Sequence, residues 1–318
     1  MDDRMLRATK SALTQCMGIS KKETLLVITD EPLRRIGYAF WEAGKRLGVE
    51  SMIVEILPRE TNGAEPPEAI AKLMSAVDVV IAPTSKSLSH TDARRSASAN
   101  GVRIATLPDV TADCVRRTLI VDYWTIKRLT DKLTAMVTKA STAHVTTPAG
   151  TDLRMSLKGR ACHPDTGIAH TKGDFTNLPA GEAYIAPVEG TAEGVAVVDG
   201  SMSGWGLTRS PIIIRIKKGF AVEFEGGKGA DTVSRIVKKV GRLGANIAEL
   251  GIGTNSKARV TGHTLEDEKA IGTVHVAVGD NRSMGGKVGV PLHLDAVMLR
   301  PTLTLDDRVI MRDGKLLV

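Results

Sequence analysis

The sequence predicts an α/β protein with an N-terminal parallel-sheet domain followed by a β-rich α+β domain. The first observation is that short apolar strands alternate with amphipathic helices, a pattern typical of parallel sheets with helical crossovers. The second is a change of pattern after Ser141, where short strands follow one another between glycine-rich turns. We therefore expect domains at residues 1–141 and 142–318.

Glycine and proline bound the N-terminal elements. A first amphipathic helix over residues 4–17 ends at Gly18, and Pro32 lies near the start of a second helix, which stops at Gly48. The expected apolar strands are residues 25–29, 51–57, 77–82 and 102–107. The later helices are expected at residues 66–76, 87–100 and 122–139. Together they make the alternating order of a parallel sheet.

The C-terminal elements are mostly short strands. The first of them are expected at residues 144–147, 152–157, 182–187, 194–199, 211–217 and 221–225. One clear helix runs from Asp231 to about Leu243, because its valines and isoleucine recur at the i, i+3, i+4, i+7 spacing. A hairpin with Asp313-Gly314 at its turn ends the pattern.

Composition argues against several classes of protein. No apolar run approaches the roughly 20 residues of a membrane span, and the first ten residues do not resemble a signal peptide. The formal net charge is +7, but the basic residues are dispersed, and with three Trp, three Tyr and four Phe there are few platforms for stacking bases. Three widely spaced cysteines indicate no disulfide framework. We expect a cytoplasmic protein without nucleic-acid or membrane partners.

The candidate active site lies between Asn246 and Asp295. Residues 273–279 alternate strictly, so His275 points away from the three valines of that strand. In the same way His293 and Asp295 share one face of a second short strand. Imidazoles and carboxylates held on strands with apolar backs are preoriented ligands for a divalent metal. We therefore predict that the C-terminal domain binds metal and is catalytic.

Other polar motifs are weaker candidates. The segment Gly226-Gly227-Lys228-Gly229 precedes a helix but lacks the spacing of a phosphate-binding loop. No Gly-x-Ser-x-Gly elbow of a serine hydrolase is present in the sequence. A second group of possible ligands, near residues 162–170, is interpreted as a polar loop, since Cys162 and His163 point opposite ways on an extended segment.

The candidate site resembles the aminopeptidase T (M29) family of metallopeptidases, which includes a related branch of 2,5-dihydroxypyridine dioxygenases. The matching segments are residues 181–187, 249–253, 267–269, 275–279 and 293–295. The resemblance implies a homodimer and a metal-dependent hydrolase, which cleaves peptide or small amide bonds with a metal-activated water. It implies two divalent ions, Zn, Co or Mn, and places the metal-site and catalytic residues at Glu182, Glu249, Glu268, His275, His293 and Asp295.

Two assignments follow from this resemblance. Glu182 or Glu249, if not fully committed to metal, would be the general base. The family's peptidases carry a tyrosine seven residues after the His275 position, and this chain has Arg282 there. An arginine would stabilise an oxyanion or bind a substrate carboxylate.

The alternative interpretation is the dioxygenase branch. Residues 285–287 and 293–295 resemble segments of those enzymes, which hold one Fe(II) and cleave an aromatic ring with dioxygen. Their site has a histidine at the position of Glu249, so a triad of two histidines and one carboxylate here would require His275 beside His293 and Asp295. Because Glu249 and Glu268 are both present, the two-metal hydrolase is favoured at this point.

Overall fold

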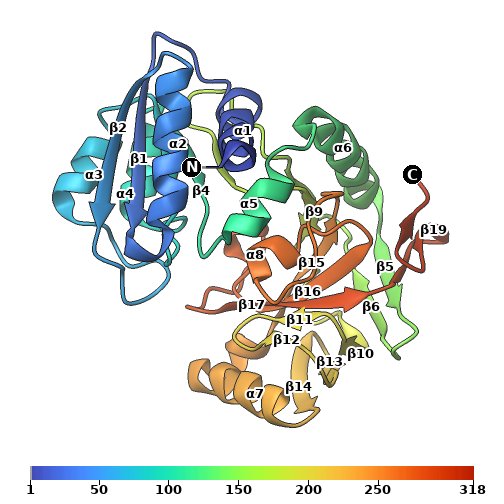
Figure 1. Ribbon diagram of the computed structural model, residues 1–318. Coiled ribbons are helices and arrows are strands. Elements are labelled where there is room, and N and C mark those ends of the chain that lie inside the picture. Colours follow the sequence, from blue (N-terminus) through green and yellow to red (C-terminus); the bar gives the residue numbers. More distant parts are fainter. Residues whose placement is uncertain (1) are drawn as a thin grey trace. The chain divides into compact units, whose positions relative to one another are not determined.

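A computed structural model describes residues 2–318 and shows a mixed α/β protein with one parallel and two mainly antiparallel sheets (Figure 1). Contacts within the chain define two compact units, Met1–Lys127 with Thr166–Ala180, and Arg128–Asp165 with Gly181–Val318. The expectation of a parallel-sheet region followed by a β-rich region is confirmed. The division of the chain differs from a single boundary at residue 141, because a short segment returns to the first unit.

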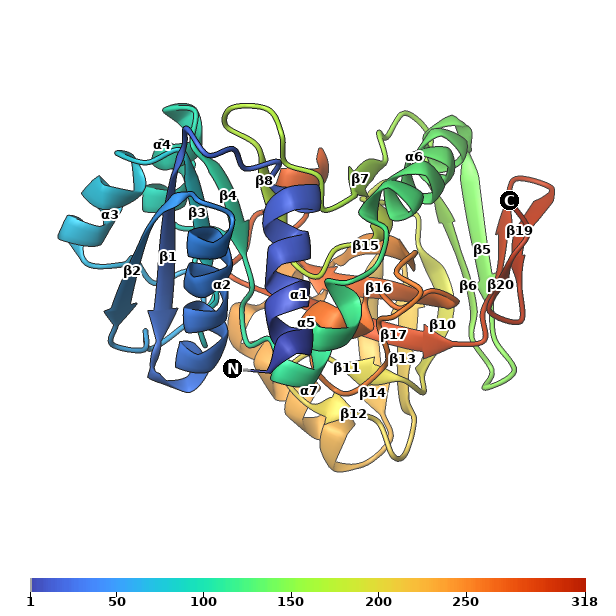
Figure 2. The same cartoon turned by 45° about the horizontal axis from the view of Figure 1, so that its top comes forward.

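The first unit is built on a five-stranded parallel sheet in the order β2-β1-β3-β4-β8. The three inner strands, β1, β3 and β4, are almost wholly buried. Their apolar sequences fit a sheet that has little contact with water. Figure 2 shows α2 lying along β1 and β2. The helices of this unit are α1 Asp3–Ser11, α2 Arg34–Arg46, α3 Glu68–Met74, α4 Asp92–Ala99 and α5 Ala112–Thr118. The strands are β1 Thr24–Asp30, β2 Glu50–Ile56, β3 Val79–Ala82, β4 Arg103–Thr106 and β8 Phe175–Asn177.

Strand β8 explains why the division is not a single cut. It pairs in parallel with β4, with Thr176 opposite Ala105, although the two strands are about seventy residues apart in the sequence. The helix α6, Tyr123–Lys139, spans the point where contacts change from one unit to the other. Leu133 and Val137 on its later turns already belong to the core of the second unit. The helix expected at residues 122–139 is therefore present, but the first unit does not end with it.

The second unit contains an eight-stranded and a seven-stranded sheet. The eight-stranded sheet has the order β14-β13-β10-β6-β5-β18-β19-β20. Its strands are β5 Thr142–Thr146, β6 Asp152–Ser156, β10 Glu193–Val198, β13 Ile212–Lys217, β14 Phe220–Glu225, β18 Thr302–Leu305, β19 Arg308–Arg312 and β20 Lys315–Leu316. The helix α7, Lys228–Val240, is the one expected from the apolar spacing, and Val233 and Val237 are buried in the core.

The seven-stranded sheet carries the candidate site and has the order β12-β11-β17-β16-β15-β9-β7. Its strands are β7 His163–Asp165, β9 Glu182–Ile185, β11 Ser201–Met202, β12 Gly206–Leu207, β15 Ile247–Gly253, β16 Thr273–Gly279 and β17 His293–Leu299. A short helix, α8 Thr264–Asp267, lies between β15 and β16. One face of this sheet is apolar and packs into the core, through residues such as Leu250, Ile252, Val274, Val276 and Leu294.

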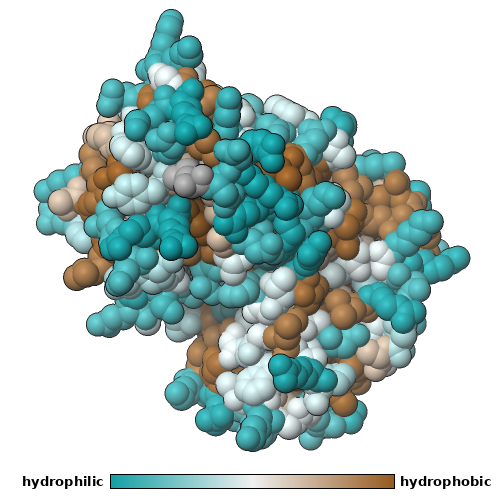
Figure 3. All heavy atoms as spheres, in the orientation of Figure 1, coloured by the Kyte–Doolittle hydropathy of each residue, from teal (hydrophilic) through white to brown (hydrophobic). Residues whose placement is uncertain are grey.

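The surface carries no strong apolar feature in the view of Figure 3, where hydrophilic residues predominate and apolar ones form small scattered patches. Single exposed apolar side chains such as Leu57 are ordinary on protein surfaces. Among residues 2–318, none of the helices combines the length and the apolar character that a bilayer span requires.

Candidate metal centre

Register across the seven-stranded sheet places five of the predicted residues on one face. Directly opposed residues share a face, and Glu249 on β15 stands opposite Ala277, which stands opposite Asp295 on β17. His275 and His293 lie two residues from Ala277 and Asp295, so they project the same way. Glu182 on β9 joins the row because it is opposite Gly253, four residues along the strand from Glu249.

Glycine at position 251 makes room for the deepest imidazole. His275 stands opposite Gly251 and is fully buried. A Cβ atom on residue 251 would lie 2.0 Å from Nε2 of His275, far inside van der Waals contact. The Gly251-Ile252-Gly253 segment is therefore strand rather than a turn. Glu249 lies inside the same strand, β15.

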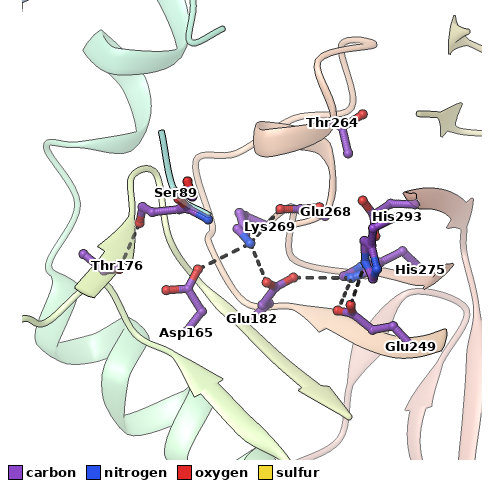
Figure 4. A network of polar contacts seen from close by, with 12 residues as sticks. Ser89, Asp165, Thr176, Glu182, Glu249, Thr264, Glu268, Lys269, His275 and His293 are labelled. Carbon is purple, nitrogen blue, oxygen red and sulfur yellow. Dashed lines mark hydrogen bonds and ion pairs between the residues drawn. The ribbon is translucent and has the colours of Figure 1, made fainter. Parts of the chain in front are cut away.

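Glu249 lies between the two imidazoles. Its Oε1 atom is 3.3 Å from Nε2 of His275, and its Oε2 atom is 3.0 Å from Nε2 of His293. Nε2 of His293 is also 3.3 Å from Oδ1 of Asp295. On the other side, Nε2 of His275 is 3.4 Å from Oε2 of Glu182 (Figure 4). Five carboxylate and imidazole side chains from four strands thus point at one another.

The orientation of His293 suits metal binding. Its Nδ1–H donates to the main-chain carbonyl of Asp280 at 2.9 Å, so Nε2, which faces Glu249 and Asp295, is the atom that would bind a cation once its proton is displaced. The side chain of His293 is 33% exposed, whereas that of His275 is fully buried. The His293 end of the cluster is therefore the end that small molecules reach.

The pKa values in the cluster follow from burial and close charges. Burial raises the pKa of Glu182 to about 7, although the ammonium of Lys269 opposes the shift. Burial alone would raise the pKa of Glu249, but hydrogen bonds from the two histidines outweigh it and leave this pKa below its usual value. For His275, the hydrogen bond to Glu249 and nearby carboxylates outweigh burial and raise the pKa to about 9. In the metal-free protein these shifts favour a charged Glu249 and a protonated His275, and a bound cation would displace the proton.

The described residues form three overlapping groups that could hold a cation, each with ligand atoms within 4.8 Å of one another. All six predicted metal residues appear in them. The groups are Glu182 with Glu249 and His275, Glu249 with His293 and Asp295, and Glu268 with His275 and Asp295. Within residues 2–318, none of these groups contains both histidines. The triad of His275, His293 and Asp295 considered from the sequence is not among these groups and stays a prediction.

Arg282 lies beside this cluster and not among its ligands. It begins a short 3-10 helix, Arg282–Met284, and its side chain is 68% exposed. The guanidinium Nε is 3.2 Å from Oδ2 of Asp280, the residue whose carbonyl accepts from His293. Arg282 is thus linked to the metal residues through Asp280. Its catalytic role stays a prediction.

Sequence reasoning missed two charged residues of the site, Lys269 and Asp165. The ammonium of Lys269 is buried between the carboxylates of Asp165, Glu182 and Glu268 (Figure 4). Asp165 was interpreted as part of a polar loop, yet it is on β7, opposite Glu182. Lys269 follows three acids in the run Glu266-Asp267-Glu268, which by itself reads as an exposed charged turn.

Comparison with known proteins separates fold from family. The chain matches the family model described as 2,5-dihydroxypyridine 5,6-dioxygenase over residues 4–318. A curated 2,5-dihydroxypyridine 5,6-dioxygenase of Pseudomonas putida KT2440 is 26% identical over 192 residues, which are 56% of this chain and 55% of that protein. The chain is thus aligned by sequence to about half the length of that relative.

Two solved structures share the fold over nearly the whole chain. The 2,5-dihydroxypyridine dioxygenase of Pseudomonas putida KT2440 superposes with a TM-score of 0.81 at 22% identity, covering 99% of this chain and 97% of that one. AmpT from Thermus thermophilus superposes with a TM-score of 0.74 at 16% identity, covering 99% of each chain. At these identities each likeness shows the fold alone.

The expectation of an aminopeptidase-like metal-dependent hydrolase is wrong. It was drawn from segments such as residues 249–253 and 293–295, whose ligand types serve hydrolases and oxygenases alike, and the likeness to AmpT is one of fold. The family match extends over residues 4–318 and supports the alternative interpretation, the dioxygenase branch. This chain belongs to the 2,5-dihydroxypyridine 5,6-dioxygenase family.

Proposed function

We propose that the protein is a metal-dependent dioxygenase that opens the ring of a small dihydroxylated aromatic compound, with 2,5-dihydroxypyridine as the first substrate to test. The observation that carries the proposal is the family match over residues 4–318 together with a metal-ligating cluster on one face of the sheet. The reaction would place both atoms of dioxygen in the ring-opened product.

The donor set fits a divalent cation. Each candidate group offers one imidazole and two carboxylates, ligands that suit Fe(II) as well as Mn(II) or Zn(II). Two buried polar atoms, Oε2 of Glu182 and Nδ1 of His275, have no hydrogen-bond partner in the described structure. Such orphaned atoms mark a site that is incomplete as a purely protein structure.

We assign the cation to Glu249, His293 and Asp295. This group contains the one imidazole of the cluster that is partly exposed, so a substrate can approach it. A bound Fe(II) would supply the one-electron chemistry that dioxygen requires to react with an aromatic ring. The protein's own contribution is to fix the direction of the ligands, through the Asp280 carbonyl on His293 and the Ser203 hydroxyl that accepts from the main-chain N–H of Asp295.

We propose Glu182 as the group that accepts a proton from the substrate. Glu249 contacts both histidines, whereas the buried Oε2 atom of Glu182 makes no hydrogen bond and has only a 3.4 Å ion contact with Nε2 of His275. A ring hydroxyl that loses its proton during binding would deliver it to this atom. Of the two general bases inferred from the sequence, we therefore propose Glu182. The homodimer and the cytoplasmic location stay predictions.

The test is oxygen consumption by protein reconstituted anaerobically with Fe(II). We expect 2,5-dihydroxypyridine to disappear with one O2 consumed per ring, and two labelled oxygen atoms in the product when the gas is ¹⁸O2. His293→Ala should abolish the reaction, while His144→Ala should not, because His144 lies on β5 of the other sheet and pairs with Asp152. Iron-loaded wild-type protein that consumes no oxygen with hydroxylated pyridines or benzenes would overturn the proposal.

A further inference from the structure

The most unusual group in the second unit is a buried ammonium. The side chain of Lys269 is 2% exposed. Its Nζ atom is 2.5 Å from Oε1 of Glu182, 2.8 Å from Oε1 of Glu268 and 3.3 Å from Oδ2 of Asp165 (Figure 4). An ammonium has three N–H donors and here it faces three carboxylates, so each donor has an acceptor.

The backbone holds Lys269 in this place independently of its side chain. Its carbonyl accepts from the main-chain N–H of Asn255 at 2.8 Å, just beyond the end of β15. Gly253 allows the turn to approach, because a Cβ atom there would lie 2.1 Å from the carbonyl oxygen of Ala270. The pairing of β7 with β9 sets Asp165 opposite Glu182. The ammonium is thus a built part of the site.

Lys269 competes with two of the three candidate cation groups. One group requires Glu182 and another requires Glu268, and both carboxylates are ion-paired with Lys269. The third group, Glu249 with His293 and Asp295, contains none of the carboxylates that are ion-paired with Lys269. A divalent ion in either of the first two groups would therefore lie near a fixed positive charge in a buried environment, where repulsion is strong.

We infer that Lys269 occupies the place of a second metal and restricts the centre to one divalent cation, held by Glu249, His293 and Asp295. The inference rests on the metal centre of the proposed function and adds the residue that limits this centre to one metal. The ammonium neutralises the Glu182 end of the cluster, and the metal neutralises the His293 end.

The experiment counts Mn(II) ions bound per chain. Wild-type protein is stripped of metal, equilibrated with Mn(II) in excess by dialysis, and analysed for manganese and protein. We expect one ion per chain for the wild type and two for Lys269→Met, which removes the charge and keeps the length of the side chain. Lys269→Arg should stay at one. As a matched control, Lys238→Met removes a lysine from the surface helix α7 and should also stay at one.

Paramagnetic resonance gives a second readout that does not depend on turnover. One isolated Mn(II) is expected in the wild type, and an exchange-coupled pair in Lys269→Met, since the candidate groups share ligands. Two ions in the wild type would overturn the inference, as would a folded Lys269→Met that still binds one. If Lys269→Met does not fold, the wild-type count and Lys269→Arg decide. One bound ion without oxygen consumption would sink the proposed function and leave this inference standing.

Discussion

Two strands of this protein are buried to the same degree but have opposite characters. Strand β3 in the first unit is buried at all four positions and is wholly apolar. Strand β16 in the second unit is buried at all seven positions, yet it alternates valines with polar or small residues, including His275. Alternation is usually a sign that one face meets water. Here the polar face is buried as well, so the alternation marks a site.

The physical difference lies in what each buried face requires. The apolar residues of β3 need only close packing, and the hydrophobic effect stabilises them without partners. A buried imidazole or carboxylate is costly unless another charge or a hydrogen bond faces it. The charged face of the second unit is therefore an interdependent set, in which removal of one member leaves others unpaired. The predictions below separate these two kinds of burial.

The largest effect is expected on the charged face. Asp295→Ala removes a carboxylate from two of the candidate groups and leaves His293 without one of its partners. Loss of an outer partner of a metal ligand costs roughly 10–100-fold in metal affinity, so loss of the ligand itself should cost more than about 100-fold and abolish turnover. Metal analysis after gel filtration measures it. An Asp295→Ala protein with full metal content and turnover would show that this face is only structural.

A change in the apolar face should act on stability alone. Ile28 on β1 is fully buried in the core of the first unit. Ile28→Ala should lower the free energy of unfolding by about 2–5 kcal/mol through lost burial and a cavity. Denaturant melts measure this, with Leu57→Ala as the control because Leu57 is 79% exposed. The number of metals per chain should not change in either variant. Loss of metal from Ile28→Ala would show that the apolar core of the first unit also affects metal binding.

At the edge of the charged face, a smaller effect is expected for Arg282. Its guanidinium is mostly exposed and touches Asp280, so an ordinary surface ion pair would contribute about 0.2–1 kcal/mol. Arg282→Ala should therefore lower turnover or substrate affinity by about 2- to 5-fold while the metal content stays normal. Steady-state kinetics and metal analysis check both parts. Arg308→Ala, on β19, is the comparison. Unchanged kinetics would show that Arg282 is a surface charge.

The smallest expected effect concerns a buried thiol near the site. Burial raises the pKa of Cys162 to about 12, so at pH 8 the thiolate that reacts with alkylating reagents is scarce. Native protein treated with iodoacetamide at pH 8 should leave Cys162 unmodified, whereas denatured protein should be labelled. Peptide mass spectrometry distinguishes the two. Rapid labelling of the native thiol would mean that this part of the second unit opens readily.

The sequence predicts the local part of the candidate site well. Alternation over residues 273–279 and 292–295 puts His275, His293 and Asp295 on a common face, and the register of β16 and β17 agrees. The same reasoning cannot find the charges that meet from distant segments. Lys269 donates a hydrogen bond to Glu182, which is 87 positions away in the chain. The local sequence around either residue does not indicate that the two meet. Such pairings follow from tertiary packing.

The limits of prediction for the fold and for the reaction have different causes. The strand–helix alternation of the first unit is local and is predicted, but β8 has three residues and joins the sheet from far along the chain. No periodicity is detectable in so short a strand. For the reaction, the ligands themselves are ambiguous, because carboxylates and imidazoles bind hydrolytic and redox metals alike. Only comparison with the dioxygenase family separates them.

Strand β8 has a consequence for how the protein is made. During synthesis the ribosome releases β4 well before β8, so the parallel sheet has an open edge until the chain has grown past Asn177. An unpaired edge is a template for pairing with another nascent chain. A fragment that stops at residue 141 would keep that edge permanently and would tend to associate with its copies. The polypeptide must therefore be translated beyond its midpoint before its first unit can complete its sheet.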